Sequence, residues 1–324
     1  MTMTTRAFSS RPGATDALRF VLNLPFAYLG TALLLLFAYF TRPMLLSPLL
    51  LLLIVRQAAP LGIAVIGQSV CMRVLSLDLS IGGVIVAVSY ILTSGALPYP
   101  PPVLIAICIL FGLVVGLANA FFITRLRASS VIVTLAMAMI LSGVVISLGQ
   151  FYAPGDAPEV LKFIGQKRIG IVPIALLVWL ALLIPFALFL RFSVFGRYVD
   201  AIGSNPNAAW VSGIPYIRVL TVVHVMSSLF AVASGLLLVG FVGVGSMDIG
   251  SDLALNSLAA VILGGVTFGS GKGGVLGPAV AAFMLTFSFN LLTSLGLGEP
   301  GKLMLQGAII AVAAMAYAVR MQRT

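Results

Sequence analysis

Charged side chains are scarce in this sequence, and their scarcity decides which solvent surrounds the folded chain. Only 8% of the 324 residues are charged, whereas 61% are hydrophobic. Soluble proteins carry about 25% charged residues, because water has to solvate their surfaces. So few charges exclude an ordinary soluble protein and make lipid the solvent of most of the outer surface.

Histidine and cysteine are nearly absent, which excludes most kinds of catalytic and metal-binding site. His224 is the only histidine, and the two cysteines, Cys71 and Cys108, each lie inside an apolar segment. A catalytic triad or a clustered metal site needs more such residues, so we predict no catalytic residue, no metal site and no cofactor. An ionisable residue inside a membrane segment is a candidate for function by default, so the role of His224 stays open.

Two further patterns exclude nucleotide chemistry and nucleic-acid binding. Residues 269–274 resemble a phosphate-binding loop, but Val266 stands where that motif needs glycine, and Gly273 stands where it needs Ser or Thr. We interpret these glycines as a tight turn and expect no ATP hydrolysis by this chain. The net charge is +10, but its basic residues are scattered singly between apolar runs, a pattern typical of membrane topology signals rather than of nucleic-acid binding.

The apolar runs predict an all-α, polytopic transmembrane helix bundle of about ten spans. A spanning helix needs about 20 mostly apolar residues, and charges and Pro/Gly clusters divide the chain into pieces of that size. The expected spans are 21–40, 49–72, 81–97, 103–124, 129–148, 171–190, 219–242, 253–268, 275–295 and 303–319. Between Arg56 and Gly83, a half-span or re-entrant segment is an open alternative.

The distribution of basic residues predicts the orientation of the bundle. Ten spans place both termini on one side, and two thirds of the Lys and Arg residues then lie on that side. Because cytoplasmic loops are enriched in these residues, we expect both termini in the cytoplasm. The predicted parts are a cytoplasmic tail over 1–20, a membrane domain over 21–319 and a second cytoplasmic tail over 320–324.

The longest polar connection, between Arg191 and Arg218, contains the strongest local signal. Asn205 is a good helix cap, and Pro206 suits the first helical position, so residues 206–212 are predicted to form a short helix. Gly213 and Pro215 end it. Trp210 and Val211 place apolar surface on this polar loop, which indicates contact with a partner protein or a membrane surface.

Four blocks of this sequence resemble, in order, those of one family of membrane permeases. They are Asp78-Leu79-Ser80-Ile81-Gly82, the stretch from Ala201 to Ile214, Leu258 to Gly265, and Gly271 to Gly277. Over residues 45–316 the chain is similar to the ribose/xylose/arabinose permeases of ATP-binding-cassette (ABC) importers, which include branched-chain amino-acid relatives. Asn207 replaces the Glu of the Glu-Ala-Ala loop that such permeases carry, which puts any salt bridge of that Glu in doubt.

The resemblance implies a function and a set of partners. Such permeases sit in the bacterial inner membrane as homo- or heterodimeric pairs, dock cytoplasmic ATP-binding subunits and receive solute from a periplasmic binding protein. The chain itself would be no enzyme, since a separate subunit hydrolyses ATP. By this analogy residues 205–214 form the coupling helix, with Asn205, Asn207, Ala208, Ala209, Gly213 and Ile214 at the contact.

The expected solute is a monosaccharide such as ribose or xylose. The alternatives are a permease for branched-chain amino acids or another small solute, and an ion-coupled secondary transporter.

A few polar residues within the spans are candidates for the translocation path. Asp78 and Ser80 cap the following helix, line the path, or do both. Asn119, Asn256 and Asn290 also suit passage of a neutral sugar, although hydrogen bonds between helices explain them equally well.

Overall fold

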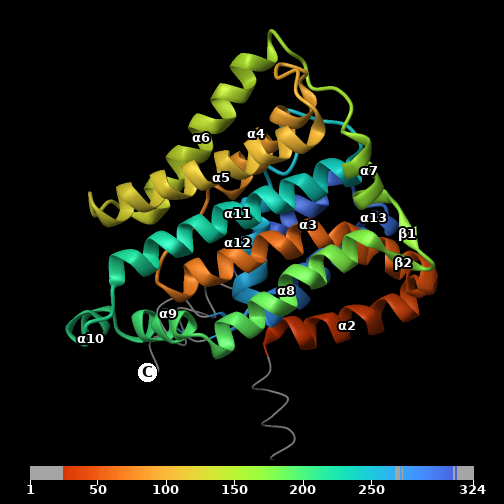
Figure 1. Cartoon of the computed structure of the whole chain (residues 1–324). Coiled ribbons are helices and arrows are strands. Elements are labelled where there is room, and N and C mark those ends of the chain that lie inside the picture. Colours follow the sequence, from red (N-terminus) through yellow and green to blue (C-terminus); the bar gives the residue numbers. More distant parts are fainter. Residues whose placement is uncertain (1–24, 267–270, 272, 309–310, 312–324) are drawn as a thin grey trace, which may run out of the picture.

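Helices form almost all of the regular structure in the computed structural model of the chain (Figure 1), which describes residues 25–266, 271, 273–308 and 311. In chain order the elements are α2 (Phe26–Thr41), the 3₁₀ helix η1 (Pro43–Leu46), α3 (Pro48–Arg73), α4 (Ile81–Thr93), α5 (Pro101–Thr124), α6 (Ser130–Gly149), α7 (Glu159–Gln166), β1 (Arg168–Ile169), β2 (Val172–Pro173), α8 (Ile174–Phe192), α9 (Val194–Ser204), α10 (Pro206–Val211), α11 (Tyr216–Val242), α12 (Leu253–Leu263) and α13 (Leu276–Ser294). Residues 299–308 are helical as well. The predicted tails, 1–20 and 320–324, and Lys272 lie outside the described residues.

The prediction of an all-α, polytopic bundle is confirmed. In the described part of the chain, six helices are long and apolar enough to cross a membrane, namely α3, α5, α6, α8, α11 and α13. Three shorter helices, α2, α4 and α12, are also apolar. Helices α5 and α6 expose many large apolar side chains, such as Leu110, Ile132 and Met139. Lipid tails can solvate such a surface and water cannot, so this face fits a bilayer.

Several predicted boundaries were wrong. The span expected over 81–97 is the 13-residue helix α4, which ends at Thr93, and the span expected over 253–268 ends at Leu263. The segment 149–170, left between the expected spans 129–148 and 171–190, contains the helix α7, and the antiparallel strands β1 and β2 follow it. Of the last expected span, only residues 303–308 and 311 are described, and their helix already begins at residue 299.

Helix α11 runs through the middle of the bundle and packs closely against its neighbours. A Cβ atom at Gly67 of α3 would lie 2.7 Å from the backbone of Ser227, and one at Gly116 of α5 would lie 2.6 Å from that of Val225. Only glycine permits such close helix approach, which is how helices associate where no hydrophobic effect drives them together. Apart from α11, the core contains α3 and α4, and every residue of α4 except Ile91 is buried.

The two ends of the bundle carry different structures. Figure 1 shows α9 and α10 at one end and α7, β1 and β2 at the opposite end. Helix α7 buries Leu161 and Gly165 against the last turns of α11, where a Cβ atom at Gly240 would lie 2.2 Å from the backbone oxygen of Leu161. The segment between the expected spans 129–148 and 171–190 therefore packs against the end of α11.

Candidate functional site

The short helix α10 has the geometry that its sequence predicts. The Asn205 side chain accepts a hydrogen bond from the Ala208 backbone N–H at 3.0 Å, which caps the helix. Gly213 adopts a left-handed conformation with φ of +80°, and the Ile214 N–H donates to the Ala209 carbonyl at 3.1 Å, which ends the helix. The helix covers Pro206–Val211, which confirms the predicted 206–212 to within one residue.

Helix α10 packs one side against the protein and exposes apolar side chains on the other side. Ala209 is buried and Ile214 half-buried, whereas Asn207 and Ala208 are exposed. Trp210 and Val211 are 61% and 86% exposed. An exposed tryptophan and valine on a rigid, capped helix form a surface that suits a protein partner.

Helix α9 connects α10 rigidly to the membrane helices. Asp200 of α9 forms an ion pair with Arg73, the last residue of α3, whose side chain is only 6% exposed. A Cβ atom at Gly203 would lie 1.9 Å from the backbone oxygen of Arg73 and 2.4 Å from Cα of Gly271. Gly271 and the end of α3 thus lie directly against α9. Neither the ion pair nor the two-glycine contact was predicted from the sequence.

Three of the five predicted path residues lie together in a fully buried cluster. The Asp78 carboxylate accepts hydrogen bonds from the backbone N–H and the hydroxyl of Ser80, at 2.9 and 2.5 Å, and the Asn119 amide donates to the Ser80 hydroxyl at 2.9 Å. For Ser80 the predicted capping role was wrong, because the hydroxyl of this N-cap residue of α4 accepts no bond from the first turn. Asp78 does accept a backbone N–H at the start of the helix, that of Ser80.

His224 belongs to the same buried cluster. Its Nε2 atom lies 2.8 Å from the Ser76 hydroxyl, and one ligand atom each from Cys71, Asp78 and His224 lies within 4.8 Å of the others. These residue types can bind a divalent cation such as zinc. Their spacing in the sequence could not reveal the cluster, because Ser76 and His224 are 148 positions apart.

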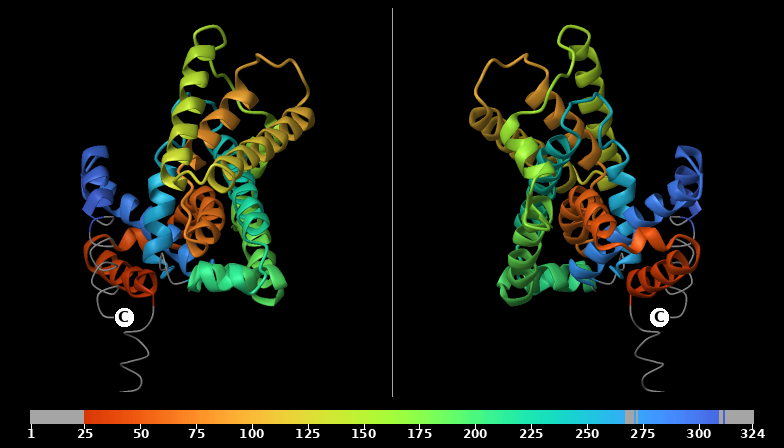
Figure 2. Two further views of the ribbon diagram at one scale, coloured as in Figure 1. Left: turned by 90° about the vertical axis from the view of Figure 1, so that its left-hand side faces the viewer. Right: turned by 90° about the vertical axis from the view of Figure 1, so that its right-hand side faces the viewer.

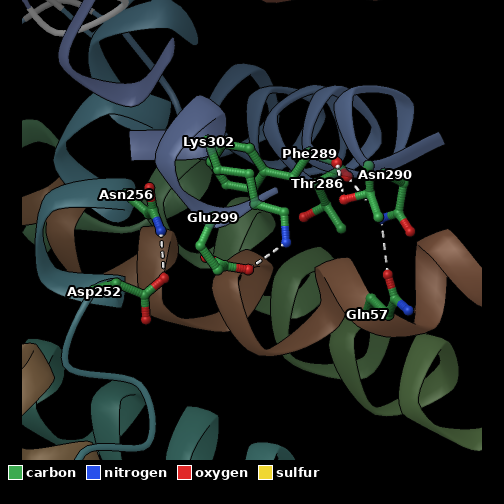
Figure 3. Close-up of polar contacts among 9 residues, drawn as sticks. Gln57, Asp252, Asn256, Thr286, Phe289, Asn290, Glu299 and Lys302 are labelled. Carbon is green, nitrogen blue, oxygen red and sulfur yellow. Dashed lines mark hydrogen bonds and ion pairs between the residues drawn. The ribbon is translucent and has the colours of Figure 1, made fainter. Parts of the chain in front are cut away.

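The other two predicted path residues, on α12 and α13, form hydrogen bonds of their own, which Figure 3 shows. The Asn256 amide donates to the Asp252 carboxylate, and that of Asn290 donates to the Gln57 side-chain oxygen, both at 2.8 Å. Asn256 is buried, and its Oδ1 atom has no hydrogen-bond partner in the described part of the chain. Beyond these pairs, Lys302 donates to Glu299 at 2.5 Å.

The described residues thus form a polytopic membrane protein with a short, capped helix that exposes apolar side chains at one end of the bundle. Residues 50–314 match the family described as branched-chain amino acid transport system / permease component. The chain belongs to this family. It is a multi-pass permease of the bacterial inner membrane and a component of an ABC import system.

The chain is also similar to individual permeases. It is 30% identical to the fructose import permease protein FrcC of Rhizobium meliloti over 250 residues, which are 74% of this chain and 69% of that relative. It is 27% identical to the autoinducer 2 import system permease protein LsrD of Escherichia coli strain K12 over 258 residues, covering 76% of this chain and 77% of that relative. No solved structure matches the chain.

Proposed function

We propose that the chain forms the translocation path of an ABC importer for a monosaccharide or a closely related polyhydroxylated solute. The two relatives named above are import permeases for fructose and for autoinducer 2, which favours a sugar-like solute over a branched-chain amino acid. Within the described residues, the exposed polar side chains on or beside α12 and α13 include the Gln57 amide, the Asp252 and Glu299 carboxylates and the Thr293 hydroxyl. Such groups hydrogen-bond to hydroxyls and fit a neutral solute.

ATP hydrolysis, in this proposal, takes place on a separate cytoplasmic subunit that docks on α10. The observation that carries it is the exposure of Trp210 and Val211 on a helix that is capped at both ends and joined by α9 to Arg73. A rigid body of this kind can transmit movement of the ATP-binding subunits to α3, which switches the bundle between outward and inward openings.

The proposed topology has about ten spans with both termini cytoplasmic, tails over 1–20 and 320–324 and the permease domain over 21–319. The basic residues support it, and α9 and α10 lie at the end opposite α7, β1 and β2 (Figure 1). The proposed assembly is a pair of permeases, identical or different, with two ATP-binding subunits and a periplasmic binding protein at the α7 end.

Reconstitution tests this function. The permease is placed in liposomes together with an ATP-binding subunit and a periplasmic binding protein, and uptake of ribose, xylose, fructose and leucine is measured. We expect ATP-dependent uptake of one of the sugars and none of leucine. Uptake by the permease alone, driven by an ion gradient, would instead identify a secondary transporter.

A further inference from the structure

The chain between α11 and α12 does not cap the bundle as a loop but descends beside α4. A Cβ atom at Gly245 would lie 1.9 Å from the Thr93 hydroxyl at the end of α4, and the Ser246 N–H donates to the Ser89 hydroxyl at 3.3 Å. Farther along, a Cβ atom at Gly250 would lie 2.5 Å from the Ile85 side chain. Figure 2 shows this segment in cyan beside the orange helix α4.

The descent ends well below the end of α11. A Cβ atom at Gly235 would lie 3.4 Å from the backbone of Ile85, and Gly235 precedes the last residue of α11 by seven positions, a rise of about 10 Å. A Cβ atom at Gly82, nearly one turn deeper in α4, would lie 2.8 Å from the Ser251 backbone oxygen. Helix α11 exceeds the roughly 30 Å hydrocarbon core by only about 5 Å at each end, so the segment around Ser251 reaches roughly 5–10 Å into the membrane.

One edge of this segment is polar and uncovered. We call residues 246–252 the descending segment. Gly250 is buried against α4, whereas Ser246, Asp248, Ser251 and Asp252 are exposed. Within the described chain neither carboxylate has an ion-pair partner, and Asp248 and Glu299 both repel the Asp252 carboxylate.

Lipid cannot cover such an edge. Irregular backbone exposed to hydrocarbon leaves polar groups without partners, and it occurs at membrane depth only where protein buries it or where it lines a water-filled cavity. Hydrocarbon disfavours a charged carboxylate, and unpaired carboxylates in a dry protein interface are also costly. Water is the solvent that satisfies both the backbone and the repelling carboxylates.

We infer that the descending segment forms a wall of the aqueous solute path and presents its hydroxyl, carboxylate and backbone groups to a hydroxylated solute; this rests on the proposed function. The wall continues onto α12, where the Asn256 amide donates to the Asp252 carboxylate. It also includes the hydrogen-bonded pair of Gln57 on α3 and Asn290 on α13 (Figure 3). The path thus runs along α12, α13 and α3 rather than through the sealed cluster around Asp78.

Cysteine labelling tests this placement. Ser251→Cys is reacted with a membrane-impermeant cationic thiosulfonate in proteoliposomes, and Asp248→Cys serves as a second position if the first variant does not fold. The unsubstituted chain gives the background, since both of its cysteines are buried. The control is Met139→Cys on α6, which is 69% exposed and lies at a matching depth, because a Cβ atom at Gly83 would touch the backbone of neighbouring Ala138.

We expect Ser251→Cys to react at least tenfold faster than Met139→Cys and to be protected by sugar-loaded binding protein. Equal rates at the two positions, or disulfide crosslinking of Ser251→Cys between two copies without labelling, would overturn the inference. Labelling without protection would place the segment in water but outside the path, which also overturns it. In all three cases sugar uptake by the reconstituted importer is measured separately, so the proposed function stands or falls by itself.

Discussion

Replacement of Gly213 by valine is expected to uncouple transport from ATP hydrolysis. Gly213 has φ of +80°, and nothing lies within 4 Å of the position that its Cβ atom would occupy. The substitution therefore meets no steric obstacle, and its entire cost comes from the left-handed backbone, about 1–2 kcal/mol for an L residue and more for a β-branched one. That cost corresponds to a roughly 5- to 30-fold depletion of the native turn.

Without the native turn, α10 loses its fixed orientation relative to α11. We therefore expect sugar uptake per ATP hydrolysed to fall at least fivefold in proteoliposomes that contain the ATP-binding subunit and the binding protein. Gly213→Asn is the matched control, because asparagine tolerates the left-handed region, and it should retain most of the coupling. Normal coupling in Gly213→Val at normal expression would refute the reasoning, and so would equal losses in both variants.

Three further predictions concern contacts elsewhere in the chain. Gly203→Val should lower the melting temperature in detergent, because its Cβ atom would lie 1.9 Å from a backbone oxygen of α3, whereas Gly143→Val, with open space around it, should melt like the parent. Trp210→Ala should weaken co-purification of the ATP-binding subunit without changing the melting temperature, since this side chain is 61% exposed, and unchanged co-purification would argue against docking at α10. Asp78→Ala should destabilise the protein by about 1–3 kcal/mol, because the buried backbone N–H of Ser80 loses its acceptor; a melting temperature equal to that of the parent would contradict this.

Local chemistry was sufficient to predict the membrane class and the short helix α10. Hydrocarbon excludes charge and requires about 20 apolar residues per span, so composition and charge spacing revealed a polytopic bundle. The ends of α10 follow from Asn205, Pro206 and Gly213, whose conformational preferences act within a single turn. Because these effects do not depend on distant parts of the chain, the sequence determines them by itself.

Which polar residues meet inside the bundle depends on contacts between distant segments, and no local sequence pattern reveals these contacts. The expected spans 219–242 and 253–268 left a break between them, but only the tertiary contacts show that the chain there runs back along α4. Likewise, Asp78, Asn119 and His224 come from three segments that the sequence presents as separate. A buried polar group has to find a partner wherever the folded helices bring one, so tertiary structure alone decided which polar residues are sealed inside the bundle and which face the proposed path.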